Sequence, residues 1–148
     1  MTSDDDGRAM IEFIFLGVLT LVPLLYLVVA AFQLERNVFA VTQAAREAGR
    51  AYATADDPVG AEQRASYAMH LALADQGVVG EATMTYVPVS AACGGGPSGA
   101  QSLAPGSDFA VCVTRVMTIP GVPGFVSGRR NTVTGRYVVH IDDFRSAR

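Results

Sequence analysis

The chain contains no tryptophan and no lysine, so all of its 11 basic residues are arginines. A net charge of −3 and an acidic cluster near the N-terminus exclude the basic surface that binds nucleic acid. Two histidines and two cysteines are present, and none of them has a neighbour at metal-ligand spacing. The triplet Gly94-Gly95-Gly96 precedes neither a helix nor a Lys-Ser/Thr pair, which excludes a phosphate-binding loop.

These absences predict a protein that is not an enzyme and that uses no cofactor, metal or small-molecule substrate. His70 is expected on the surface of a helix, and His140 on the solvent face of the last strand. Asp142-Asp143 follows that strand and is typical of a solvated turn. None of these residues is expected to be catalytic.

Charge is also missing from the apolar run Phe13–Phe32, which reads FIFLGVLTLVPLLYLVVAAF. About 20 such residues in a helix span roughly 30 Å, the thickness of the hydrocarbon core of a bilayer. One alternative is a buried helix of a soluble domain. Another is a secretory signal cleaved near Val29-Ala30-Ala31, although this run is longer than the apolar part of most signals. We therefore predict a transmembrane helix over residues 8–34.

The helical pattern continues beyond the apolar run as far as Tyr52. Apolar residues recur there at helical spacing, which predicts an apolar stripe made of Leu34, Val38, Val41, Ala45, Ala48 and Tyr52. A row of small residues lies on the adjoining face and consists of Ala40, Ala44 and Ala48. Because no break separates Ala9 from about Ala53, we predict one helix of about 45 residues, roughly 65 Å long.

The remaining chain predicts a small α+β domain. Asp57 and Pro58 are typical of a helix start, and that helix should run to about Gln76 and end at Gly77. Alternating apolar residues predict about three antiparallel strands, at 82–89, 109–119 and 133–141. Two loops separate the strands: 91–107, rich in Gly, Ala, Ser and Pro, and a second loop that contains Phe125 and Val126.

The two cysteines, Cys93 and Cys112, both lie far beyond the apolar run. Cysteines stay reduced in the cytoplasm, whereas an isolated pair in a small domain outside the membrane tends to be oxidised. We expect a disulfide that closes a loop of about 20 residues and contributes roughly 3 kcal/mol on the chain-entropy model. The alternative is two unpaired buried thiols.

Arginines flank both ends of the apolar run. Arg8 precedes it, whereas Arg36, Arg46 and Arg50 follow it. Taken alone, the positive-inside rule would place the C-terminal part in the cytoplasm.

A glycine just ahead of the apolar run and a lone glutamate inside its start form the most informative local pattern, Gly7-Arg8-Ala9-Met10-Ile11-Glu12-Phe13. A charged residue at the centre of a membrane helix costs on the order of 2.5–3.5 kcal/mol, and less near the interface, so such residues are candidates for function. The alternative is that Glu12 only marks the interfacial end of the helix.

This pattern resembles the processing site of type IV prepilins, in which a peptidase cuts after the glycine and a glutamate followed by an aromatic residue comes later. The segment 43–51, QAAREAGRA, is similar to the signature that follows the membrane helix in TadE-like pseudopilins. These proteins belong to tight-adherence (Tad, Flp) pilus assembly systems. The two motifs together cover residues 7–53.

The resemblance implies a minor pilin or pseudopilin with residues 1–7 as a leader, residues 8–34 as the transmembrane helix and residues 35–148 as an extracytoplasmic pilin-like domain. It also implies insertion in the cytoplasmic (inner) membrane with the N-terminus inside, which overrides the arginine count. Cleavage between Gly7 and Arg8 would create an α-amine that pairs with Glu12 of a neighbouring subunit.

The partners implied by the resemblance are the membrane, the prepilin peptidase, other pilins and pilus assembly proteins. Two other functions stay open. A membrane-tethered binding module outside the cell would keep its intact N-terminus. A secreted enzyme released by signal peptidase would instead begin near Phe32.

Overall fold

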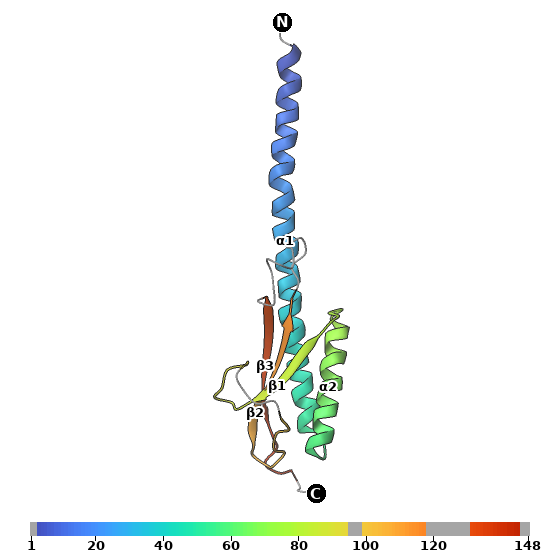
Figure 1. Ribbon diagram of the computed structural model, residues 1–148, viewed down its shortest axis with the longest axis vertical. Coiled ribbons are helices and arrows are strands. Elements are labelled where there is room, and N and C mark those ends of the chain that lie inside the picture. The colour runs from blue at the N-terminus through green and yellow to red at the C-terminus, as the bar shows by residue number, and fades with distance from the viewer. Residues whose placement is uncertain (1–2, 95–98, 118–130, 146–148) are drawn as a thin grey trace. The chain divides into compact units, whose positions relative to one another are not determined.

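The computed structural model describes residues 3–94, 99–117 and 131–145 of the chain. It contains a long N-terminal helix, a second helix and a three-stranded antiparallel sheet (Figure 1), which confirms the predicted α+β class. The described ranges do not include Gly95, Gly96, Phe125 and Val126, which the sequence analysis names, or the end of the predicted strand 109–119.

Helix α1 covers Ser3–Ala53, a continuous run of 51 residues that contains Pro23. From Gly7 onward it is the one described helix that is long and apolar enough to cross a membrane, and none of its most apolar window is buried. The chain divides into two units, Met1–Leu34 and Glu35–Arg148. Helix α1 therefore supplies the whole of the first unit's helical structure and the first element of the second.

The start of α1 differs from the prediction, because the helix begins at Ser3 and not at Ala9. The segment from Ser3 to Ala9 contains no proline, so its sequence has no residue that must end a helix there. Farther along, Thr20 Oγ1 donates a hydrogen bond to the Leu16 carbonyl at 2.9 Å, which satisfies a hydroxyl within the apolar stretch.

Helix α2 covers Pro58–Asp75 and begins where the sequence predicts. The Asp57 carboxylate accepts a hydrogen bond from the Gly60 N–H at 2.9 Å and so caps the first turn. Gln76 is the C-terminal cap, and Gly77 follows with a positive φ of 61°, a conformation that favours glycine. The predicted end of this helix is thus confirmed to within a residue.

Strands β1 (Ala82–Val87), β2 (Asp108–Val116) and β3 (Thr132–His140) form one sheet in the order β1-β2-β3. Both pairings are antiparallel. Strand β1 ends before Pro88, two residues short of the predicted end, because proline has no N–H to donate to the ladder.

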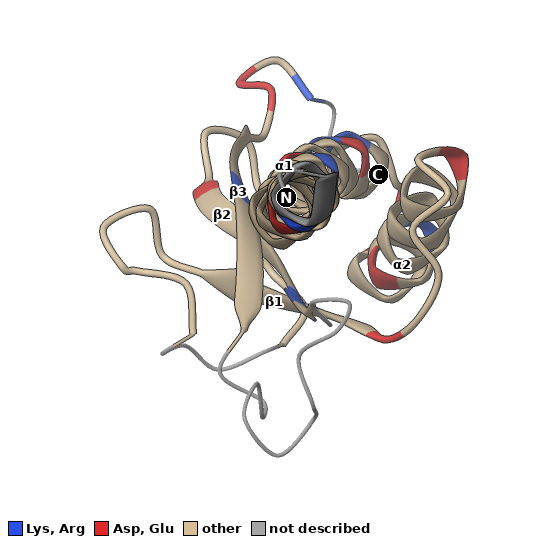
Figure 2. Cartoon of the chain, turned by 90° about the horizontal axis from the view of Figure 1, so that it is seen from above, with Lys and Arg blue, Asp and Glu red and all other residues tan. Residues whose placement is uncertain are grey.

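The alternation of side chains gives the sheet two different faces. In the second unit, α1 and α2 lie on the same side of the sheet (Figure 2). Side chains of β2 that point to this side, Phe109, Val111 and Val113, belong to the main core. The helices contribute to this core chiefly small residues: Ala40, Ala44, Ala45, Ala48, Ala61, Ala65 and Ala72. Small side chains allow the helices to approach the sheet and each other closely.

The predicted stripe on α1 is only partly buried. It is buried from Val41 to Tyr52, but Leu34 and Val38 are 45% and 43% exposed. Arg36 already contacts the residues that end α2, so the turns around Leu34 and Val38 lie at the margin of the core. The predicted apolar stripe therefore enters the core only from Val41 onward.

Candidate functional sites

The residues of the predicted processing site lie on the surface of α1. Gly7, Arg8 and Glu12 are all exposed. The residues on either side of Glu12, Ile11 and Phe13, are 71% and 78% exposed. Glu12 is therefore a carboxylate set among exposed apolar side chains.

Arg8 and Glu12 lie one helical turn apart, yet they are not among the ion pairs of the described residues. An exposed pair at this spacing stabilises a helix by only about 0.2–0.5 kcal/mol. The Glu12 carboxylate is thus sterically open to a cation from another molecule.

The fold gives no packing reason for glycine at position 7. A β-carbon built there would meet nothing within 4 Å, and Gly7 has no positive φ. Gly17, farther along α1, is similarly open. Glycine inside a helix costs about 1 kcal/mol relative to alanine, and packing explains the glycine at neither position.

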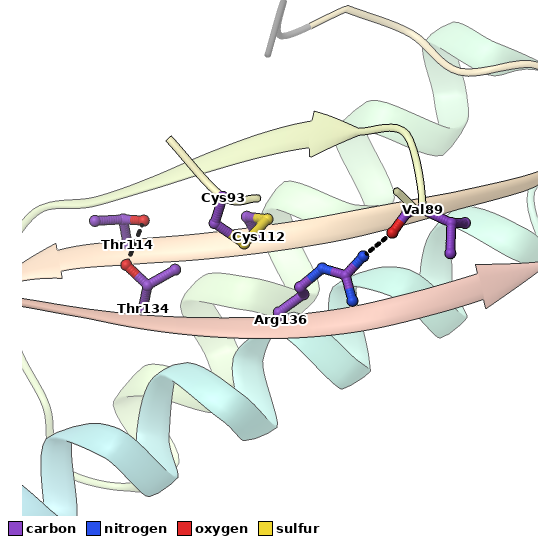
Figure 3. Close-up of a disulfide and its surroundings, with 6 residues drawn as sticks. All are labelled: Val89, Cys93, Cys112, Thr114, Thr134 and Arg136. Carbon is purple, nitrogen blue, oxygen red and sulfur yellow. Dashed lines mark hydrogen bonds between the residues drawn. A yellow bond between two sulfur atoms is a disulfide. The ribbon is translucent and has the colours of Figure 1, made fainter. Parts of the chain in front are cut away.

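The cysteine pair lies on the face of the sheet opposite the helices (Figure 3). The sulfur atoms of Cys93 and Cys112 are 2.01 Å apart, at disulfide distance, with a sequence separation of 19. Cys112 is fully buried in the middle of β2, where it packs in a small cluster with Val87 and Ala110. The pair holds the start of the long loop against the sheet.

A second contact lies just before the same loop. Arg136 of β3 donates a hydrogen bond through Nη2 to the Val89 carbonyl at 2.5 Å, beside the cysteine pair (Figure 3). On the same face the hydroxyls of Thr114 and Thr134 lie 3.0 Å apart across β2 and β3. These contacts join β3 to β2 and to the residues that follow β1.

The histidines are exposed, as the sequence predicts. His140 Nδ1 lies 2.7 Å from an Asp108 carboxylate oxygen, and His140 Nε2 lies 3.7 Å from Asp143. The hydrogen bond to Asp108 is the main reason that the pKa of His140 is raised above 6.5. Sequence reasoning missed this pair, although Asp108 and His140 stand at the facing ends of neighbouring strands.

Besides Arg136, three described arginines donate hydrogen bonds to backbone carbonyl groups, and sequence reasoning missed all of these contacts. Arg36 donates to the carbonyls of Gln76 and Gly77, with distances of 2.7–2.9 Å. Arg115 donates to the Val79 carbonyl, and Arg145 donates to the carbonyls of Ala53, the last residue of α1, and of Ala55. These contacts satisfy carbonyls that helix ends and turns leave without partners.

A buried tyrosine holds the described end of the long loop. Tyr52 is fully buried, and its hydroxyl donates to the Gln101 carbonyl at 2.8 Å and accepts from the Gln101 N–H. Burial raises the pKa of Tyr52, and it raises the pKa of Tyr86 further. The rings of Tyr52, Tyr86 and Phe109 pack together with centroid distances of 5.1–6.0 Å. Both hydroxyls are therefore neutral structural groups.

Within the part of the chain that the structure describes, no group of three or more His, Cys, Asp or Glu side chains is placed to hold a metal ion. Comparison with known proteins finds no matching family model, no matching curated sequence and no matching solved structure. The features that remain as candidates for function are the Gly7–Glu12 segment, the apolar helix and the exposed helical faces of the second unit.

Proposed function

We propose that this chain is a non-enzymatic minor pilin or pseudopilin of the TadE-like kind, which takes part in assembling a Tad/Flp-type pilus or a related envelope machine. It would be a single-pass protein of the cytoplasmic membrane, with the second unit outside. Its partners would be the prepilin peptidase, which removes residues 1–7, and other pilins and pilus assembly proteins.

The observation that carries this proposal is that Gly7 and Glu12 are both exposed on α1 and make no contact that the fold requires. Gly7 has no role in the fold, and Glu12 is exposed among apolar side chains without an ion pair in the described chain. The fold does not require these two residues, and they stand at the spacing of a prepilin processing motif. This combination favours recognition by another protein.

The second unit supports the same proposal. Its core is built on the C-terminal part of α1, which is lined by small residues, and on a short sheet that carries a cysteine pair at disulfide distance. Oxidised cysteines are typical of domains outside the cytoplasm. Arg136, Thr114 and Thr134 on the face of the sheet opposite the helices make hydrogen bonds within the fold, which is the use expected of them in a structural subunit.

The mature N-terminus tests the proposal. In the native host, mass spectrometry should find that the protein begins at Arg8. Gly7→Val should accumulate a longer form in the membrane. Gly17→Val is the matched control, since Gly17 is equally open on the same helix and should not affect processing. Wild-type protein that still carries residues 1–7 would contradict the proposal and favour a membrane-tethered binding module.

A further inference from the structure

The chain that follows β3 joins three parts of the second unit. We name residues 141–145 the C-terminal strap. Its first residue, Ile141, is fully buried, and the backbone of Ile141 exchanges hydrogen bonds with residues 106–107, just before β2. Its last residue, Arg145, donates hydrogen bonds to backbone carbonyls at the end of α1 and just after it. The strap is therefore attached at one end to the sheet and at the other to α1.

The middle of the strap is a tight, exposed turn. The Asp142 carboxylate accepts a hydrogen bond from the Phe144 N–H at 2.8 Å, and this local bond shapes the turn. Phe144 itself is 95% exposed. The side chain of Asp143 points back toward the sheet, because a β-carbon built at Gly106 would lie 2.9 Å from Asp143 Oδ1. Asp143 is thus the residue of this turn that faces the body of the unit.

The imidazole of His140 stands between two carboxylates from different elements. Its Nδ1 lies 2.7 Å from Asp108 Oδ1 at the start of β2, and its Nε2 lies 3.7 Å from Asp143 Oδ2 of the strap. On the same face of β3 the next charged side chain is Arg136, roughly 13 Å away along the strand, and Arg136 is hydrogen-bonded to the Val89 carbonyl. The charges that act on the ring are therefore those of the two aspartates.

Only the protonated ring can satisfy both carboxylates. An imidazolium has two N–H donors, whereas a neutral imidazole has one N–H and one nitrogen with a lone pair. After His140 loses a proton, the remaining N–H stays with the closer carboxylate, that of Asp108, and the lone pair of Nε2 faces the negative charge of Asp143. The hydrogen bond to Asp108 is the main cause that raises the pKa of His140 above 6.5, so this loss occurs near neutral pH.

We propose that His140 and Asp143 form a pH-dependent latch, in which the imidazolium holds the middle of the C-terminal strap against the sheet and loss of its proton releases the turn that carries Phe144. The latch is closed at low pH and opens as the pH rises, because the contact with Asp143 requires the proton. The two attached ends keep the strap in place, so the turn loosens while the fold persists. This inference concerns the second unit alone and does not depend on processing at Gly7.

A fluorescent reporter in the strap tests the latch. The chain contains no tryptophan, so Phe144→Trp introduces a single indole, and the side chain that it replaces makes almost no packing contact. The fluorescence anisotropy of this variant, measured on the full-length protein in detergent, reports motion of the turn on the nanosecond scale. We expect the anisotropy to decrease as the pH is raised from about 6 to about 8, while the near-ultraviolet circular dichroism of the tyrosines stays constant.

Three further substitutions in the Phe144→Trp protein identify the groups responsible. His140→Asn removes the titrating ring, and Asp143→Asn removes the charge that the lone pair repels, so each should abolish the decrease in anisotropy. His70→Asn is the matched control, since His70 is the other histidine of the chain and is exposed on α2. It should keep the decrease. It also leaves His140 as the only histidine, so its ring signal in NMR should titrate with the same midpoint as the anisotropy.

The inference is overturned if the anisotropy of the Phe144→Trp protein does not decrease over this pH range. It is also overturned if the decrease survives His140→Asn or Asp143→Asn, because another group then controls the turn. A decrease accompanied by loss of the tyrosine signal would mean that the unit unfolds, which contradicts a local latch.

Discussion

Gly135 of β3 lies directly against the backbone of α1 at Val41. A β-carbon built at position 135 would come 2.6 Å from the Thr42 nitrogen and closer still to the Val41 carbonyl. Gly49 of α1 makes the reciprocal approach, since a β-carbon there would lie 2.6 Å from the Tyr137 ring. Two glycines, one on each element, thus set the distance between helix and sheet.

Gly135→Ala should therefore destabilise the second unit by about 3 kcal/mol, at the upper end of the usual cost of overpacking, because its methyl group meets backbone that cannot move aside. Urea unfolding of the full chain in detergent, followed by the near-ultraviolet signal of its tyrosines, would measure the change. Gly99→Ala is the control, because a β-carbon there meets nothing within 4 Å and Gly99 has no positive φ. Equal stability of the two variants would contradict the close approach.

Cys93 and Cys112 should be found linked in protein taken directly from the cell envelope. Non-reducing peptide mapping should recover the two cysteine peptides as one species. Replacing both residues with alanine should cost roughly 3 kcal/mol, the chain-entropy value for a loop of about 20 residues. Two free thiols in the isolated protein would contradict the bridge and would weaken the proposed extracytoplasmic location.

Glu12→Gln should leave membrane insertion and the second unit intact but reduce recovery with other pilins. The physical reason is that the mutation leaves the α-amine of a neighbour buried without its counter-charge, which costs roughly 3–5 kcal/mol. Co-purification from membranes and counting of pili would measure the effect.

Glu35→Gln is the matched control for Glu12, since Glu35 is an exposed glutamate of the same helix, placed after the apolar run. It should behave as wild type. If Glu12→Gln cells assemble normal pili and retain their partners, Glu12 is only an interfacial residue.

The His140–Asp108 pair should make stability depend on pH. Because the folded pKa of His140 is raised above 6.5, its contribution is complete below that value and is lost as pH rises through the raised pKa. In the wild type, the urea concentration at the midpoint of unfolding should therefore decrease as the pH is raised from about 6 to about 8. His140→Asn or Asp108→Asn should flatten this slope, while His70→Asn should keep it. A wild-type midpoint that rises over the same range would refute the pairing.

Local sequence patterns were sufficient for the elements themselves. The uncharged run Phe13–Phe32, the Asp57-Pro58 start of α2 and the alternation along β2 and β3 each depend on chemistry within a few residues. The cysteine pair could also be expected, because only two cysteines occur. The spacing of Gly7 and Glu12, on which the proposed processing depends, is likewise a local pattern, and the fold adds that Gly7 has no packing role.

Other features were decided only by tertiary structure. Helical periodicity specifies which side of α1 is apolar, but the buried length depends on where α2 ends, and so Leu34 and Val38 are exposed. The contact of Arg36 with Gln76 joins residues separated by 40 positions, and no local pattern predicts such a pair. Gly135 is required only because the Val41 backbone lies against it. Contacts between residues that are distant in the chain depend on how whole helices and strands pack against each other, and local sequence patterns do not contain that information.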